Sequence, residues 1–230
     1  MKKNLDQLIN MRFVDDLVHN WNGSAQAKDA KTGKYVISNH HSAARFGIEN
    51  PEAVYGYTIQ DLDLIMNSHW GDTAKRIEDQ DSQIYYTQQM IVDRNRVFLT
   101  AAGQVYVHNV NKYPILNGAN KVSLILTTNE DITSQISPLE LLNLYRMHYK
   151  IGNRNDLIRA FLAHIEIVNY FIILPTYAEL NVLLIYARYS QLKLVAQHLK
   201  VSLKTVDSHL RSLRDKSSIN LHELILRIRY

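Results

Sequence analysis

The segment AQHLKVSLKTVDSHLRSLRDK, residues 196–216, constrains the fold of this chain more than any other. It places two stretches of helical periodicity on either side of a short turn at 200–202. The serine that ends the turn is a favourable N-cap, and Val206, Leu210 and Leu213 follow it at helical spacing. The pattern predicts two short helices packed across a tight corner.

The second of these helices has a polar side opposite its apolar stripe. That side carries Lys204, Asp207, Ser208, Arg211 and Asp215. In a helix-turn-helix, the first helix braces the second so that the second can lie in the major groove of DNA. We interpret the polar side as a surface that contacts DNA. The alternative is an ordinary solvated face, because surface helices commonly carry Lys and Arg.

The order of residues around this corner is specific over about fifty positions. The relevant features are Thr176, Glu179, Val182-Leu183, Lys193 to Ala196, Leu199 to Ser202, Thr205-Val206, His209 and Lys216. In this order, residues 175–224 resemble the LuxR-type helix-turn-helix domain. The resemblance implies an all-α DNA-binding domain of four helices that dimerises, often through its last helix, here about 220–229. We expect the four helices near 177–188, 191–199, 203–216 and 220–228.

The resemblance also implies roles for individual side chains. Base contacts would come from Asp207, Ser208 and Arg211. Phosphate contacts would come from Lys193, Lys204, Thr205 and Lys216. These roles fit the chemistry, because Arg can pair bidentately with guanine, Asp can accept from cytosine N4, and Lys adds salt-sensitive affinity for phosphate.

The sequence departs from the family pattern at three places. One is Ser217, where the family has leucine, and the stretch after it is one residue short. Tyr189 stands where the family commonly has a glycine that ends the first helix in a left-handed conformation, so we expect a different turn there. Asp207 often corresponds to a basic or neutral residue, and its charge would repel phosphates. The target sequence is therefore expected to be unusual.

Charge is distributed unevenly along the 230 residues. Residues 1–133 hold 13 Lys and Arg against 15 Asp and Glu, whereas residues 174–230 hold nine against four. A basic C-terminal segment favours a polyanionic partner. The absence of cysteine excludes disulfides, thiolate metal sites and cysteinyl-flavin photochemistry. It suits a cytoplasmic location, and no stretch approaches the ~20 apolar residues of a membrane span.

The first half of the chain has the pattern of a mostly antiparallel sheet. Short apolar runs separated by turn residues predict strands at KYVIS (34–38), RVFLTA (96–101), QVYVHNV (104–110) and KVSLILTT (121–128). Ala102-Gly103 predicts a hairpin between two of them. Residues from about 40 to 80 form a helical and looped section.

Further features of this half are Ala27 to Asp29, Gly33 to Asn39, Ala43 to Gly47, Pro51-Glu52, Gly56, Thr58, Asp61, Lys112 to Ile115 and Asn129 to Thr133. Together they resemble a PAS domain over roughly 15–133. The resemblance implies a five-stranded antiparallel sheet wrapped by helices, which can hold a small molecule, hold a cofactor or bind a partner.

Five side chains are candidates for a ligand pocket in the PAS-like domain: Phe46, Tyr55, Leu62, Tyr106 and Leu124. The alternative is that they form plain core. We expect no cofactor and no metal, and the less favoured alternative is a haem ligand among His40, His41 and His108.

The sequence thus predicts an α+β PAS-like sensor over 1–133, a helical linker over 134–173 and an all-α LuxR-type domain over 174–230. Apolar stripes at Leu141, Tyr145, Leu157 and Phe161 lie in the linker. Two alternatives stay open for them, namely packing on the sheet and a dimer seam.

The expected function is a bacterial transcription regulator. Its partners would be double-stranded DNA, a second copy of the chain and a small molecule in the PAS-like domain. A protein-interaction adaptor without sequence-specific DNA binding is the alternative. No phosphate-binding glycine loop and no ordered nucleophile set are evident, so we expect no enzymatic activity.

Overall fold

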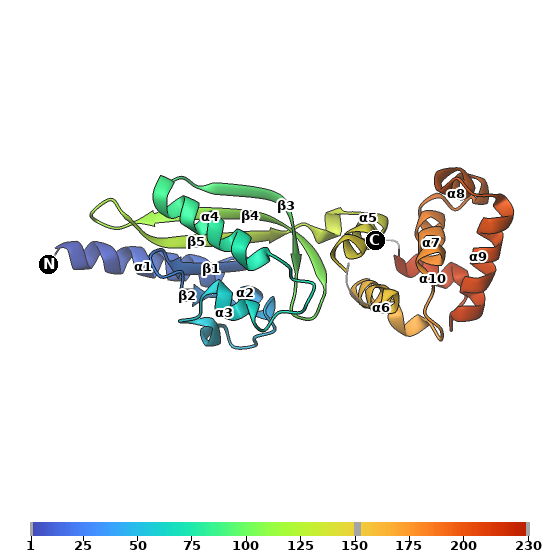
Figure 1. The fold of residues 1–230 in the computed structure, drawn as a ribbon, viewed down its shortest axis with the longest axis horizontal. Helices are drawn as coiled ribbons and strands as arrows, with labels where there is room; N and C mark the ends of the chain where they lie inside the picture. The colour runs from blue at the N-terminus through green and yellow to red at the C-terminus, as the bar shows by residue number, and fades with distance from the viewer. Residues whose placement is uncertain (1, 150–152, 229–230) are drawn as a thin grey trace. The chain divides into compact units, whose positions relative to one another are not determined.

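The computed structural model describes residues 2–149 and 153–228, with side chains from residue 11 onward. The chain divides into two compact units, Met1–Gln135 and Ile136–Tyr230, drawn in Figure 1. Within the described residues, none of the helices combines the length and the apolar character needed to cross a bilayer.

The N-terminal unit is built on one sheet. Its strands are β1 (Ser24–Asp29), β2 (Tyr35–Ser38), β3 (Ile91–Leu99), β4 (Val105–Leu116) and β5 (Val122–Asp131). They lie in the order β2-β1-β5-β4-β3, and every neighbouring pair is antiparallel. This architecture confirms the expected five-stranded PAS-like fold. The run SAQAKD of β1 was not among the predicted strands, because its composition is polar and small; pairing with β2 and β5 on both sides makes it a strand.

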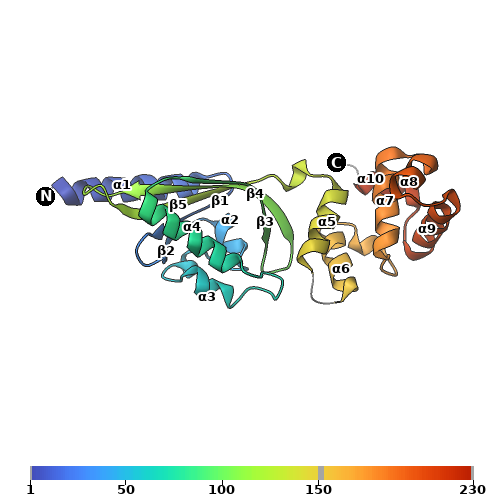
Figure 2. The same ribbon diagram turned by 45° about the horizontal axis from the view of Figure 1, so that its top comes forward.

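Helices cover both faces of this sheet (Figures 1 and 2). The face that we call outer is covered by α1 (Lys2–Asn20). The other, inner face is covered by α2 (His40–Ala44), α3 (Ile59–Asp63) and α4 (Thr73–Thr87), with a short 3-10 helix at Pro51–Val54. The outer core is apolar and consists of Val14, Val18, Ala25, Ala27, Ile37, Leu124 and Leu126.

The C-terminal unit is all-helical. Its helices are α5 (Pro138–His148), α6 (Arg154–His164), α7 (Tyr177–Tyr189), α8 (Leu192–Leu199), α9 (Leu203–Lys216) and α10 (Leu221–Ile228), with a short 3-10 helix at Val168–Tyr170. Another 3-10 helix, Thr133–Gln135, ends the N-terminal unit. The last four match the expected helices within one or two residues, although Arg229 of the proposed dimerisation segment lies outside the described residues. The all-α expectation for this end of the chain is confirmed.

The apolar stripes of α5 and α6 pack within the C-terminal unit. Tyr145 and Phe161 are fully buried, with ring centroids 5.8 Å apart. The Tyr145 hydroxyl lies 2.9 Å from Nδ1 of His164. α5 also contacts α7. These residues therefore hold α5, α6 and α7 together.

The turn after α7 ends the helix with a left-handed residue that is not glycine. Tyr189 is the last residue of the helix, and Ser190 adopts the left-handed conformation with φ of 57°. Its amide donates to the carbonyl of Tyr186 at 2.8 Å, which closes the helix end. The left-handed residue is therefore Ser190 and not Tyr189, which stands where the family commonly has glycine.

Candidate nucleic-acid interface and sensor cavity

The corner between α8 and α9 is held by apolar packing on its inner side. Val195 and Ala196 of α8 are buried, as are Val206, Leu210 and Leu213 of α9, and both helices contact α7. Lys200 ends α8 in the left-handed conformation, with φ of 55°. The Ser202 hydroxyl then accepts a hydrogen bond from the Thr205 amide at 3.0 Å and caps α9. The predicted arrangement of two helices packed across a tight turn is confirmed.

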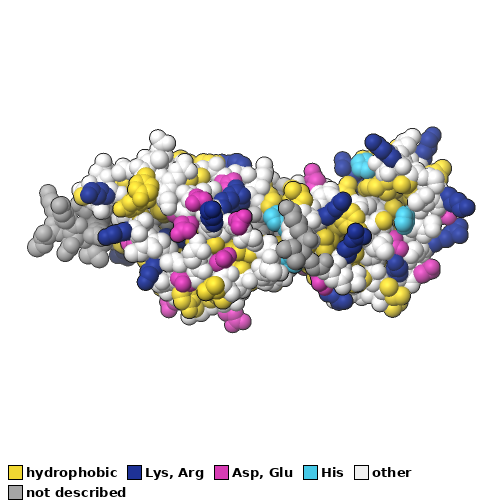
Figure 3. Space-filling model, viewed as in Figure 1, with side chains coloured by type: hydrophobic (Ala, Val, Ile, Leu, Met, Phe, Trp, Pro, Cys, Tyr) yellow, Lys and Arg dark blue, Asp and Glu magenta, His cyan; other side chains and the backbone are white. Residues whose placement is uncertain are grey.

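The side of α9 away from this packing is open to solvent. Lys204 and Ser208 are exposed, and the Asp207 and Arg211 side chains are 43% and 72% exposed. These residues recur at intervals of three and four, so they lie along one face of the helix. Figure 3 shows Lys and Arg side chains over α8 and α9. The structure thus brings the three proposed base-contacting residues and Lys204 together on one surface.

Asp207 and Arg211 form an ion pair on this surface. The carboxylate oxygen lies 2.9 Å from a guanidinium nitrogen of Arg211, one helical turn away. An exposed pair of this kind contributes only about 0.3–0.5 kcal/mol, so it breaks readily. The pair also partly neutralises the negative charge that would oppose a phosphate backbone.

The other proposed phosphate contacts lie in different surroundings. Lys193 is exposed on α8, and Thr205 is partly buried, with its hydroxyl 2.9 Å from that of Ser202. Lys216 is different, because its ammonium group bonds both carboxylate oxygens of Glu179, at 2.9 and 2.8 Å. The expectation that Lys216 contacts phosphate is therefore revised. Its ammonium charge is paired with Glu179 inside the C-terminal unit.

Glu179 is the centre of a polar cluster that joins α7 to α9. The residue is 5% exposed, and its carboxylate accepts from the Thr176 amide at 2.6 Å and the Ser212 hydroxyl at 2.5 Å. Burial by itself raises the pKa of Glu179, but the hydrogen bonds from Lys216, Ser212 and Thr176 outweigh it and lower the pKa to about 2. Glu179 thus fixes the C-terminal end of α9 against α7.

The inner face of the sheet in the N-terminal unit is unusually polar. Strand register places Arg96 of β3 opposite His108 of β4, and His108 opposite Asp131 of β5. Along β1, β4 and β5 the same face carries Ser24, Gln26, Lys28, Lys112, Thr127 and Asn129. A plain core would present apolar side chains here, as the outer face does.

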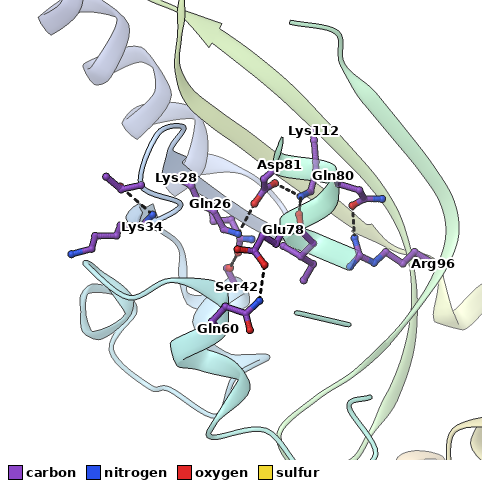
Figure 4. Close-up of polar contacts among 12 residues, drawn as sticks. Gln26, Lys28, Lys34, Ser42, Gln60, Glu78, Gln80, Asp81, Arg96 and Lys112 are labelled. Carbon is purple, nitrogen blue, oxygen red and sulfur yellow. Dashed lines mark hydrogen bonds and ion pairs between the residues drawn. The ribbon is translucent and has the colours of Figure 1, made fainter. Parts of the chain in front are cut away.

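A buried charge cluster occupies one end of the inner face (Figure 4). Asp81 of α4 bonds Lys28 at 2.7 Å and also bonds Lys112, and both lysines are about 2% exposed. Burial raises the pKa of Asp81, but the charges of Lys28 and Lys112 outweigh it, and the pKa is lowered. Burial lowers the pKa of Lys112 to about 8.

Two cavities adjoin the inner face. One, of about 510 Å³, lies beside Lys28, Asp81 and the β1–β2 turn. The other, of about 360 Å³, lies at the opposite end of β1, next to Arg45, His108 and Asp131. Both volumes suit small molecules. Among the described residues, no group of three His, Asp or Glu side chains is arranged to hold a metal ion.

The five proposed pocket residues do not gather around one cavity. Tyr106 lines the smaller cavity, and Phe46 and Leu62 are buried outside it, Leu62 as part of α3. Tyr55 is 37% exposed, and Leu124 packs against α1 on the outer face. Leu124 faces the outer side because successive residues of a strand alternate between faces.

The sequence analysis missed the polar lining of the inner face. The sequence does contain an alternating pattern that indicates this face, since Ser24, Gln26 and Lys28 occupy every second position of β1. The same spacing recurs at His108 and Lys112 in β4. Two-residue periodicity of polar side chains is the signal that could have identified this face.

No protein-family model matches the chain, and no curated protein matches it in sequence. Similar solved structures include a phage VqmA–DPO complex, with 20% identity over 97% of this chain and 88% of that chain and a TM-score of 0.48. A Vibrio cholerae VqmA–ligand–DNA complex shares 19% identity over 92% and 84%, with a TM-score of 0.45. The PAS domain of Bordetella pertussis BvgS shares 16% over 62% and 99%, with a TM-score of 0.47. The fold assignment made above depends on this chain's own strand order and helix order.

Proposed function

We propose that this chain is a DNA-binding transcription regulator of the LuxR type. Two copies would bind an operator of two half-sites through α9, and the PAS-like unit would respond to a small molecule. A dimeric helix-turn-helix protein reads half-sites about one helical turn of DNA apart, because each recognition helix enters the major groove.

The observation that carries this proposal is the braced, solvent-facing side of α9. Val206, Leu210 and Leu213 fix the rotation of the helix, so Asp207, Ser208 and Arg211 face outward. Arg211 is 72% exposed and held by a weak pair, so its guanidinium is available to exchange Asp207 for a guanine edge. The proposed phosphate contacts are reduced to Lys193, Lys204 and Thr205.

Selection of bound fragments from a randomised duplex library, followed by anisotropy titration, tests the proposal. We expect a preferred sequence whose affinity falls steeply as salt rises. Arg211→Ala should cost about 1–3 kcal/mol at the preferred sequence and relax the preference at one position. Lys204→Ala should weaken binding to all sequences alike.

A matched control is Arg159→Ala, which removes an exposed arginine from α6 in the same unit. It should leave sequence preference and affinity nearly unchanged. The proposal fails if no sequence is enriched, or if Arg211→Ala and Arg159→Ala bind the preferred duplex equally well.

A further inference from the structure

An aromatic cluster fills the centre of the N-terminal unit, between the inner face and its helices. Phe98 lies at its middle, with ring centroids 4.9 Å from Trp70 and 6.4 Å from Phe46. Tyr35 meets Phe46 at 6.3 Å, and the His108 ring stacks on Phe98 at 6.0 Å. Such a cluster ordinarily forms a dry core, in which polar atoms are rare or paired.

Polar atoms without partners surround this cluster. Buried side-chain atoms that make no hydrogen bond include the Tyr35 hydroxyl, Nε of Arg45, Nε1 of Trp70, Nη2 of Arg96 and Nδ1 of His108. Each of these five residues is linked to the cluster by a ring contact or by strand register. Native proteins leave few such groups unpaired, because each costs about 1–3 kcal/mol. Their convergence on one place indicates a missing partner.

The unpaired atoms are mainly hydrogen-bond donors. The nitrogens of Arg45, Arg96 and Trp70 can only donate, and a tyrosine hydroxyl can also donate. A partner that satisfies them must therefore present acceptors. Water or a neutral amide could accept some of these bonds, but neither would compensate the guanidinium charge of Arg45.

The Arg45 charge also lacks an ion-pair partner among the described residues, whereas Arg96 donates to Gln80 at 3.1 Å and lies 4.0 Å from the Asp93 carboxylate. The Arg45 guanidinium lies 3.5 Å from the Phe98 ring centre and donates a hydrogen bond to the Ser24 hydroxyl at 3.1 Å. Burial, with the charge of Arg96, lowers the pKa of Arg45 to about 9, and burial with the charge of Arg45 lowers the pKa of His108 to about 4. Asp131 is the acidic residue on the wall of the smaller cavity, and its Oδ1 already accepts from the amide and hydroxyl of Thr133 at 2.8 and 2.5 Å.

Access to the cluster is provided by the cavity of about 360 Å³ described above. Arg45 and His108 line that cavity and also contact Phe98, so these two residues connect the cavity to the aromatic cluster. A small molecule that enters beside Arg45 reaches the cluster once that side chain turns. Asp131 lies on the same wall, immediately before the segment that leaves the unit.

We propose that this site binds a small organic carboxylate, whose oxygens pair with Arg45 and its neighbouring donors and whose apolar part packs on the Phe98 cluster. The inference deepens the proposed function. That the bound carboxylate acts as the signal rests on the proposed function. A bidentate carboxylate matches the planar fork of a guanidinium.

Calorimetric titration of the full chain with benzoate and benzamide tests the proposal, with acetate and acetamide as a smaller pair. The members of each pair have similar shape and differ in charge. We expect benzoate to bind and to raise the melting temperature. Benzamide should bind roughly 10- to 100-fold more weakly, the ratio expected for losing a charged hydrogen-bond partner. Equal affinity within a pair, or no binding of either acid, overturns the proposal.

Variants locate the site. Arg45→Gln should weaken benzoate binding by roughly 10- to 100-fold and leave benzamide unchanged, and Arg45→Lys should restore only part of the loss. Lys31→Gln is the matched control, because this exposed lysine lines the other cavity. Far-UV circular dichroism of each variant verifies folding. Unchanged benzoate affinity in folded Arg45→Gln overturns the assignment.

The same preparations, titrated with operator DNA without any acid, keep the two conclusions separate. Binding of benzoate without any DNA sequence preference would overturn the proposed regulator and leave the carboxylate site standing. Sequence-specific DNA binding together with equal affinity for acid and amide would overturn the carboxylate site and leave the proposed regulator standing.

Discussion

At the scale of residues, Glu179 shows how one buried carboxylate positions an exposed surface. It connects the N-terminus of α7, through Thr176, to Ser212 and Lys216 near the end of α9. The opposite face of α9 is then free to contact a partner. Removing the carboxylate would leave a lysine and a serine without their acceptor, while the apolar stripe stayed intact.

We therefore expect Glu179→Gln to destabilise the C-terminal unit by about 2–3 kcal/mol, the cost of leaving charged hydrogen-bond partners unmet. The pH dependence follows from the lowered pKa of about 2 against 4.5 in the unfolded chain. The contribution is complete above about pH 4.5 and is lost as pH falls toward 2. Urea unfolding between these values should show a flatter pH dependence for the variant than for the parent. Identical slopes would contradict this role.

Asp81 has the corresponding role in the N-terminal unit, since it is bonded to both Lys28 and Lys112. Asp81→Asn leaves two buried ammonium groups without a counter-charge, and we expect it to cost about 3–5 kcal/mol. The control is Asp79→Asn, on an exposed position of the same helix, which should change stability by less than about 0.5 kcal/mol. Chemical denaturation of both variants measures the difference, and similar losses would rule out the cluster as the cause.

At the scale of elements, the start of α9 is set by a backbone turn and by the side chain that caps the helix. Lys200 ends α8 in the left-handed conformation, and two residues later Ser202 caps α9. The corner therefore depends on a single hydroxyl more than on the exposed residues around it. Val201 beside it is 39% exposed and contributes little burial.

Ser202→Ala should accordingly lower the stability of the C-terminal unit by about 1 kcal/mol, the usual cost of losing an N-cap. Ser208→Ala is its matched control, because that serine lies exposed in the middle of the same helix. Alanine has the higher helix propensity there, so Ser208→Ala should leave stability unchanged or raise it slightly. Thermal unfolding followed at 222 nm distinguishes the two. Equal losses would show that α9 does not depend on its cap.

At the scale of the whole molecule, two compact units have separate cores and separate sites. The all-helical unit includes α5 and α6, and its buried side chains include Tyr145, Phe161, Leu183 and Leu210. A unit with its own core can fold alone. The separation also means that the proposed sensing and the proposed DNA binding can be measured independently.

We expect a fragment that spans Ile136–Tyr230 to unfold in one cooperative transition and to bind duplex DNA with an affinity that falls as salt rises. Circular dichroism and anisotropy titration measure the two properties. A fragment that began at 174 would lack α5 and α6, and should unfold at a lower temperature. If the shorter fragment were equally stable, α5 and α6 would contribute nothing to this core.

The sequence by itself determined the local elements of this protein. Helix α9 was evident because Ser202, Val206 and Leu210 encode its start and its buried side through near-neighbour interactions. Four of the five strands were evident for a similar reason, since β-branched and aromatic runs prefer extended backbone. Strand β1 was missed because its polar residues take their conformation from pairing with β2 and β5.

Only the tertiary structure decided which side chains meet. Lys216 pairs with Glu179 across 37 positions of sequence, and Lys28 and Lys112 share Asp81 from three separate elements. Strand periodicity shows that Gln26 and Lys28 share a face, but it cannot show what covers that face. Contacts between distant elements depend on the packing of the whole chain, and local propensities do not contain that information.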